Sequence, residues 1–305
     1  MSEQRHEKQT VPDRVVRFSL LALVSVLGGV VLLAGGMGWL ALWGTTHPPC
    51  RTGLFPSAYG LTPQQVAIPS RTGYTYAGYL FGDNGGPTVI VPPPYGADRG
   101  GMLHEVAILV AHGYRVLTYD SRQCAGMSAH SLGPWEAQDI VDALNFLQVR
   151  DGVDTLSVGV LGFSQAGASG LIAAAQDARI QAVVAEGGYL DFVAQTIGSD
   201  ETPNLAIRLF RVGAWLAYRA ATGMNLPTLD LEPLLSAIAP RRVLLVYGEH
   251  EPTLAAAHWA AESHPHISLW LVPEASHGTY LSAAGAEAFA SNVIGFFDST
   301  LARPN

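Results

Sequence analysis

The stretch Gly162-Phe163-Ser164-Gln165-Ala166-Gly167 decides the fold that this sequence predicts. An apolar run, 156–161, precedes it, and an alanine-rich run, 168–175, follows it. We therefore expect a buried strand followed directly by a helix, with Ser164 on the turn between them. Small neighbours suit so tight a turn, which lifts a serine off the sheet and points the next backbone N–H at the same place. Taken alone, the stretch fits a catalytic serine turn and a glycine-rich turn without chemistry equally well.

Strands and helices alternate on both sides of this turn. Strands are expected at 66–68, 74–81, 88–91, 115–119, 156–161, 180–185, 243–247 and 267–272, and helices at 102–112, 134–149, 165–175, 254–263 and 282–301. The central strands are apolar throughout, which is typical of a parallel sheet covered by helices on both faces. The sequence therefore predicts an α/β fold with a doubly wound, mostly parallel sheet. The segment 189–238 interrupts this rhythm, and we interpret it as a short helical lid over the carboxyl ends of the strands.

An uncharged apolar run, 18–43, lies near the N-terminus. As a helix it is roughly 39 Å long, which is enough to cross a bilayer and too long for the hydrophobic region of a signal peptide. Four basic residues precede the run and only Arg51 follows it closely, so the positive-inside rule places the N-terminus in the cytoplasm. We expect a cytoplasmic segment 1–17, a single transmembrane helix, a linker 44–62 and an extracytoplasmic domain 63–305.

The composition argues against a nucleic-acid partner and against lysine-dependent catalysis. The formal net charge of −8 gives no support to a nucleic-acid partner. Lys8 is the only lysine and precedes the apolar run, so the domain has no Ser–Lys dyad, Schiff base or P-loop lysine. An activated serine must therefore rely on histidine. The sequence leaves open whether Cys50 and Cys124 pair or stay free, and it does not indicate the oligomeric state.

Polar residues follow two later strands at the point where each strand ends. Gly248-Glu249-His250-Glu251 follows the strand 243–247, and Pro273-Glu274-Ala275-Ser276-His277 follows the last strand. Parallel strands bring their carboxyl ends to one edge of the sheet, so an acid and His277 are expected beside Ser164. A serine nucleophile needs such a base within hydrogen-bond reach, and the base needs an acid that orients it. The chain order serine, acid, histidine is that of α/β-hydrolases.

Together these features resemble the α/β-hydrolases, in particular a serine esterase-like branch that is also similar to prolyl-oligopeptidase-type domains. The resemblance covers nearly everything from 66 to 301. The matching stretches beyond the serine turn are Asp120-Ser121-Arg122 with Gly126 and Ser128, Leu132-Gly133 with Glu136 and Asp139, Ala178-Arg179-Ile180, 230–233 and 292–301. It implies Ser164 as the nucleophile, His277 as the base and Glu251 as the acid, where the family more often has aspartate.

Some assignments stay open at this stage. Glu249 is the runner-up for the acid, and Glu186 or Asp191 after the sixth strand are further candidates.

An oxyanion hole needs two backbone N–H groups aimed at the developing charge. The resemblance implies Gln165 and Tyr95 as the donors. Pro93 and Pro94 occupy positions where related proteins have His-Gly, and proline has no N–H.

The sequence therefore predicts a membrane-anchored serine hydrolase that acts on a small-molecule ester or another acyl substrate through an acyl-enzyme. This chemistry needs no metal and no organic cofactor. Hydrolysis of peptides or amides by the same triad is one alternative, because a fold does not fix its substrate. The other is a catalytically silent binding module, for which the prolines of the oxyanion loop are the best support.

Overall fold

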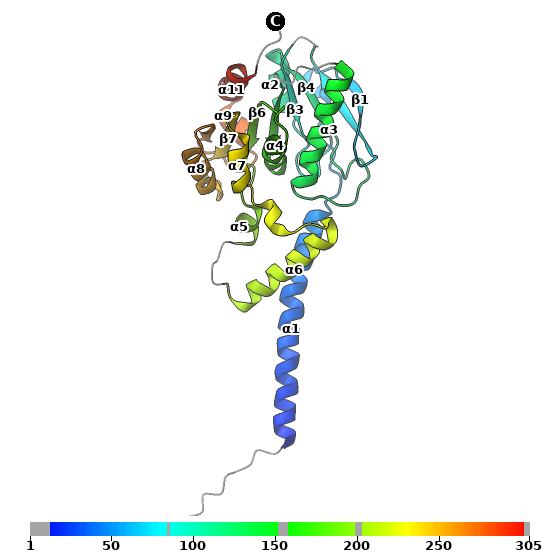
Figure 1. Ribbon diagram of the computed structural model, residues 1–305, viewed down its shortest axis with the longest axis vertical. Coiled ribbons are helices and arrows are strands. Elements are labelled where there is room, and N and C mark those ends of the chain that lie inside the picture. Colours follow the sequence, from blue (N-terminus) through cyan, green and yellow to red (C-terminus); the bar gives the residue numbers. More distant parts are fainter. Residues whose placement is uncertain (1–12, 84–85, 152–157, 199–202, 302–305) are drawn as a thin grey trace, which may run out of the picture.

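A computed structural model describes residues 13–83, 86–151, 158–198 and 203–301 of the chain. Its centre is an eight-stranded sheet with the strand order β1-β2-β4-β3-β5-β6-β7-β8 (Figure 1). β1 pairs antiparallel with β2, and β2 pairs antiparallel with β4. All other neighbouring strands in this order, from β4 to β8, pair in parallel. The predicted α/β fold with a mostly parallel sheet is confirmed.

The elements follow the predicted rhythm closely. The strands are β1 (Gln64–Pro69), β2 (Thr75–Phe81), β3 (Thr88–Val91), β4 (Arg115–Tyr119), β5 (Val158–Phe163), β6 (Ala182–Glu186), β7 (Arg242–Gly248) and β8 (Ile267–Val272). The helices are α1 (Asp13–Thr46), α2 (Leu103–Ala111), α3 (Pro134–Asp151), α4 (Gln165–Gln176), α5 (Phe192–Ile197), α6 (Leu205–Thr222), α7 (Glu232–Ile238), α8 (Leu254–Ser263), α9 (Tyr280–Ala284), α10 (Ala286–Phe289) and α11 (Gly295–Thr300), with the short turns η1 (Pro56–Tyr59), η3 (Leu226–Leu229) and η4 (Ala290–Ile294).

One expected element differs from the structure, and parts of three others lie outside the described residues. The single closing helix expected at 282–301 is divided, because Gly285 adopts a φ of 81° between α9 and α10. The first two residues of the strand expected at 156–161 lie outside the described residues, as do most of the segment 1–17 and positions 199–202 of the expected lid.

Two helical layers cover the sheet and form two hydrophobic cores. One core lies between the sheet and α3, α4, α7 and α8, and the other between the sheet and α2, α9, α10 and α11. Side chains along each strand alternate between the two cores, as in β6, where Val183 faces the first and Val184 the second. Both faces of the central strands are buried, which explains their uniformly apolar sequence.

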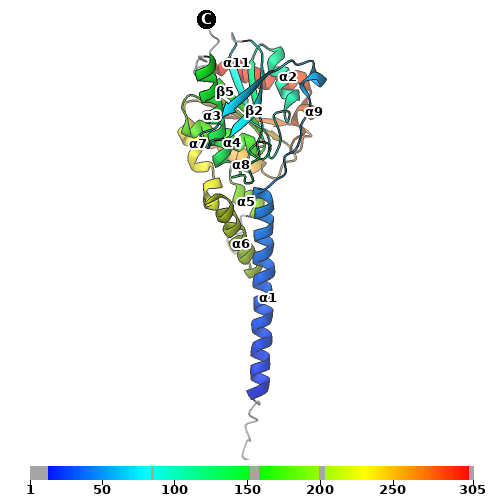
Figure 2. The same ribbon diagram turned by 90° about the vertical axis from the view of Figure 1, so that its right-hand side faces the viewer.

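α1 extends away from the α/β domain, and α6 lies beside the half of α1 that is nearer to this domain (Figures 1 and 2). A Cβ at Gly38 would lie 1.9 Å from the Phe210 carbonyl oxygen, and one at Gly213 would lie 1.9 Å from the Gly35 carbonyl oxygen. The two backbones are therefore in direct contact, as in the small-residue interfaces of membrane helices. The stretch Arg17–Thr46 is long and apolar enough to cross a membrane, and an 18-residue window within it has a mean hydropathy of 2.4.

The segment 44–62, which we expected as a linker, is held against the domain. Cys50 and Cys124 form a disulfide that joins this segment to the loop after β4. The Arg51 N–H donates to the Gly96 carbonyl at 2.8 Å, and the Asp98 N–H donates to the Arg51 carbonyl at 2.9 Å. The end of α1 is therefore fixed next to the loop after β3.

Replacing Cys124 with serine should destabilise the domain. The disulfide links residues that are 74 positions apart, and a crosslink of this span stabilises by roughly 4 kcal/mol in the chain-entropy model. We expect the melting temperature of the full chain in detergent to fall by roughly 10 °C. Cys50→Ser and the double variant should show the same loss, since all three lack one bond. A double variant that is clearly less stable than either single variant would contradict this account.

Candidate active site

Ser164 lies on a strained turn between β5 and α4. Its φ is 56° and its ψ is −125°, a conformation that residues other than glycine rarely adopt. The Ser164 N–H donates to the Glu186 carbonyl of the neighbouring strand at 2.7 Å. A Cβ at Gly162 would lie 2.5 Å from the carbonyl group of Ala166, so only glycine fits there. This is the sharp strand-to-helix turn that the sequence predicts.

The structure brings Ser164, His277 and Glu251 together from the loops after β5, β8 and β7. The Nε2 atom of His277 lies 3.0 Å from the Ser164 Oγ. The Nδ1 atom of the same ring lies 3.1 Å from Oε2 of Glu251. The ring of Phe163 packs against the His277 ring at 5.0 Å between centroids. The side chains of Ser164, His277 and Glu251 are therefore joined in one continuous series of hydrogen bonds.

The Glu251 carboxylate is buried, and both of its oxygens make hydrogen bonds. Its Oε1 atom accepts the Gly248 N–H at 2.8 Å and the Tyr280 hydroxyl at 2.5 Å. Burial raises the pKa of Glu251, but the hydrogen bonds from His277, Gly248 and Tyr280 outweigh it, so the net pKa is lowered. The group is therefore ionised at neutral pH, which favours a proton on Nδ1 of His277 and leaves Nε2 free to accept one from Ser164.

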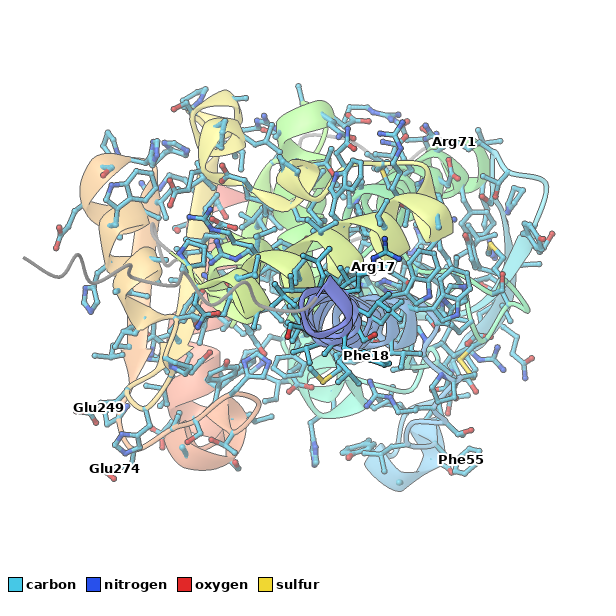
Figure 3. All side chains as sticks on the ribbon, turned by 90° about the horizontal axis from the view of Figure 1, so that it is seen from below. Arg17, Phe18, Phe55, Arg71, Glu249 and Glu274 are labelled. Carbon is cyan, nitrogen blue, oxygen red and sulfur yellow. A yellow bond between two sulfur atoms is a disulfide. The ribbon has the colours of Figure 1, made fainter. Side chains whose placement is uncertain are left out.

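Two of the other three acids proposed from the sequence bond elsewhere, and the third is buried. Glu249 accepts the Glu274 N–H at 3.2 Å, and Figure 3 shows both residues at the periphery of the domain. Asp191 caps α5 by accepting the Ala194 N–H at 3.0 Å. Glu186 is buried, and burial and then the nearby Glu105 carboxyl raise its pKa well above the usual range. Glu251 is thus the candidate acid that contacts the histidine.

Tyr95 and Gln165, the expected oxyanion donors, line the same pocket as Ser164. Gln165 is the first residue of α4, so its N–H has no acceptor within the helix. Tyr95 is held by its hydroxyl, which donates to the Thr45 carbonyl at 2.6 Å, and by the Arg51 guanidinium, which donates to its carbonyl. The residue after the prolines is therefore fixed beside the serine.

The pocket beside Ser164 has a volume of about 370 Å³. Its lining residues come from the end of α1, the loops at the sheet edge and α5. They are Thr45, Tyr95, Leu132, Ser164, Gln165, Gly187, Tyr189, Phe192, Gln195, Thr196, Glu251, Pro252, Thr253 and His277. Among the lining residues that the structure describes, most are neutral and Glu251 is the one carboxylate.

Sequence reasoning missed three residues of this site. Tyr280 donates to the candidate acid, and its only sequence signal is that it lies one helical turn after His277. Gly187 adopts a φ of 59°, and a Cβ there would lie 2.1 Å from the Tyr280 hydroxyl and 2.8 Å from Nδ1 of His277. Thr45 closes the pocket from the last turn of α1, and no sequence pattern indicates this.

Comparison with known proteins places this arrangement among hydrolases. The family model for X-Pro dipeptidyl-peptidases (S15 family) matches residues 82–287. A thiohydrolase of Arthrinium phaeospermum is 29% identical over 128 residues, 40% of this chain and 42% of that protein. A thiohydrolase of Aspergillus aculeatus is 22% identical over 197 residues, 62% of this chain and 61% of that protein. Both matches span less than two thirds of the relative.

Solved structures show the same fold. An esterase of Pyrococcus furiosus matches with a TM-score of 0.64 at 20% identity, over 85% of this chain and 99% of that one. Dipeptidyl peptidase 4 of Porphyromonas gingivalis matches with a TM-score of 0.57 at 15% identity, over 79% of this chain and 36% of that one.

Replacing Gly187 with alanine should displace the histidine. The added Cβ would overlap the Tyr280 hydroxyl and press on Nδ1 of His277. A misplacement of this kind costs roughly 100-fold in kcat/KM. Gly60→Ala is the matched control, because Gly60 has a φ of 66° and nothing within 4 Å of the added Cβ. Both variants carry similar backbone strain, so equal hydrolytic activity in the two would contradict the prediction.

Replacing Tyr280 with phenylalanine should raise the pKa of the Glu251 carboxyl. The Tyr280 hydroxyl is one of the donors that hold this pKa below its usual range. Without that donor the pKa should rise by about one pH unit, which carbon-13 NMR of labelled glutamate side chains measures directly.

Tyr114→Phe is the control for this measurement. It removes another tyrosine–carboxylate bond, from Tyr114 to Asp298 at 2.8 Å, and should leave the pKa of Glu251 unchanged. A Glu251 pKa that is identical in wild type and Tyr280→Phe would remove Tyr280 from this role.

Proposed function

Because the chain belongs to the X-Pro dipeptidyl-peptidase (S15) family of α/β-hydrolases, we propose that it is a serine hydrolase that cleaves carboxylic esters. The observation that carries this proposal is the hydrogen-bonded series from Ser164 through His277 to Glu251. The substrate is a small molecule with a neutral acyl group.

The geometry supports a two-step reaction. As the Ser164 Oγ attacks the ester carbonyl carbon, His277 takes its proton on Nε2, and the ionised Glu251 stabilises the resulting imidazolium. The N–H groups of Gln165 and Tyr95 donate to the developing oxyanion. His277 then protonates the leaving alkoxide, which departs as the alcohol, and a water molecule activated by the same histidine releases the acid from Ser164. The reaction needs no metal or organic cofactor.

The pocket chemistry favours esters over peptides with a free amino terminus. A buried ammonium group is normally paired with an opposite charge. Among the described residues that line the pocket, the one carboxylate is Glu251, which already bonds His277, Gly248 and Tyr280. Thioesters are a second candidate substrate class, because the two matched relatives are named thiohydrolases. Thioesters and esters present the same carbonyl to the serine.

The proline-rich loop does not require a silent binding module. Pro93 and Pro94 cannot donate a hydrogen bond, but Tyr95 keeps its N–H and lies at the pocket. The intact hydrogen bonds of the three proposed catalytic side chains are the argument for activity.

We also propose that α1 anchors the protein in a membrane with the hydrolase domain on the extracytoplasmic side. Most side chains of its apolar stretch are exposed, as expected for a helix surrounded by lipid and not for the core helix of a soluble protein. The Cys50–Cys124 disulfide is typical of oxidising compartments and fits this orientation. The segment 189–238, with α5, α6 and α7, would act as a lid, since Phe192 and Gln195 of α5 line the pocket.

A fluorophosphonate probe should label Ser164. We expect labelling and turnover of a p-nitrophenyl ester in wild type, loss of labelling in Ser164→Ala, and a drop of several orders of magnitude in His277→Ala. Matched acyl thioesters and aminoacyl anilides would rank the three substrate classes. A Ser164→Ala variant that is labelled as strongly as wild type would end the assignment.

The two neighbouring glutamates of one loop supply an internal control. Glu251→Gln keeps the shape of the side chain and should lower kcat by roughly 10³–10⁴-fold. Glu249→Gln alters an exposed carboxylate that bonds Glu274 and should change kcat by less than about twofold. If the effects were reversed, the acid would be Glu249.

A further inference from the structure

The outward face of α6 is apolar and positively charged. Its large hydrophobic side chains are exposed over 58% of their surface at Leu205, 54% at Val212, 36% at Trp215 and 44% at Leu216. The opposite face is buried, with Ala214, Ala217 and Tyr218 against the rest of the protein. Three arginines, and no acidic residue, lie on this helix in a chain whose net charge is −8. A basic amphipathic helix of this kind is typical of a membrane surface.

Two of the three arginines of α6 donate to neutral groups. Arg208 donates to the Pro203 carbonyl at 2.9 Å, and Arg219 donates to Oδ1 of Asn225 at 3.0 Å. Among the residues that the structure describes, neither pairs with a carboxylate. Arg219 also lies over the Trp215 ring, 5.6 Å from its centroid. Charge and apolar surface therefore coincide on one exposed face.

This face continues the surface of the candidate membrane helix. Gly38 of α1 approaches the Phe210 carbonyl and the Ala214 N–H, and Trp215 is the next residue along α6. Trp39 and Trp43 of α1 are 37% and 38% exposed, so three half-exposed tryptophans lie near the crossing of the two helices. Tryptophan is enriched where a bilayer meets water. Viewed from below, α6 runs across the underside of the domain beside α1 (Figure 3).

Part of the pocket lining lies at the same level along α1. Thr45, one of its lining residues, lies two positions after Trp43, which is about 3 Å of helix rise. Phe192, Gln195 and Thr196 line it from α5, the helix that precedes α6.

We propose that α6 lies in the surface of the bilayer that α1 crosses, and that the pocket takes its acyl esters from that bilayer. This inference rests on the proposed membrane anchor and on the proposed esterase chemistry. The apolar side chains of α6 would enter the boundary between head groups and acyl chains, and Arg208 and Arg219 would pair with lipid phosphates. A second copy of the chain is a poor occupant, because a symmetric contact between two α6 faces brings like charges together.

Depth measurements on the full chain in vesicles test the contact. The Val212→Cys variant is labelled with an environment-sensitive fluorophore and placed in vesicles of phosphatidylcholine and phosphatidylglycerol. The label reacts only with the new cysteine, because the two native cysteines form a disulfide. We expect quenching by nitroxide lipids and protection from aqueous iodide. Val149→Cys is the control, because Val149 is 89% exposed and lies 15 residues into α3, roughly 22 Å beyond its pocket-side start. Iodide should quench this control.

Two results would overturn the proposal. If iodide quenches the label at position 212 as strongly as the label at 149, the face is in water. If the label is shielded from both quenchers and the particles hold two copies, the occupant is a second chain.

The same surface can be tested by activity. The double variant Val212→Glu/Leu216→Glu should lower kcat/KM at least tenfold for a long-chain p-nitrophenyl ester embedded in vesicles. Its kcat/KM for a soluble short-chain ester should equal that of the wild type. Val149→Glu should alter neither. Equal activity of wild type and the double variant on the embedded ester would contradict the proposal.

Failure of the underlying function gives a different pattern. A chain that does not float with vesicles has no anchor, and a chain that the fluorophosphonate probe does not label has no active serine. A chain that floats and is labelled, but whose position 212 lies in water, refutes the role of α6 alone.

Discussion

The backbone at Ser164 is the constraint on which the site depends. A residue with a side chain is held at a φ of 56°, which costs about 1–3 kcal/mol. The Ser164 N–H is bonded to β6, and Gly162 lets the start of α4 close onto the end of β5. The buried central sheet holds this turn in place. Its geometry raises the hydroxyl toward His277 and leaves the Gln165 N–H unpaired beside it, so one strained residue sets both the nucleophile and one oxyanion donor.

Much of the fold and of the candidate site could be predicted from strand ends. Uniformly apolar strands alternating with helices indicated the parallel sheet, and polar residues after β5, β7 and β8 had to meet at one edge. The choice of Glu251 over Glu249 came from family resemblance, and the structure gives its physical reason. The Gly248 N–H bonds Oε1 of Glu251 across a tight turn and directs that side chain inward, and Glu249 points to the periphery.

What could not be predicted depends on contacts between distant segments. Tyr280 reaches the acid only because α9 begins directly beneath the histidine loop. Gly187 matters for the space it leaves to His277, which no local pattern records. The pairing of Cys50 with Cys124 could not be predicted, because nothing in the sequence shows that the end of α1 lies beside the loop after β4. The packing of α1 against α6 could not be predicted from the sequence either. Small residues are common in apolar helices, so their presence does not identify a partner helix.

The end of α1 is a structural part of the candidate site. The Thr45 carbonyl accepts the hydroxyl of Tyr95, the proposed oxyanion donor, and the Thr46 carbonyl accepts the His130 N–H at 2.7 Å. The described lining of the pocket beside them has few groups that select a substrate by charge, because Glu251, the one carboxylate among these residues, bonds the histidine. A neutral pocket discriminates through shape and through what reaches it. Fixing its wall to an apolar helix therefore makes the position of the domain a determinant of which acyl groups enter.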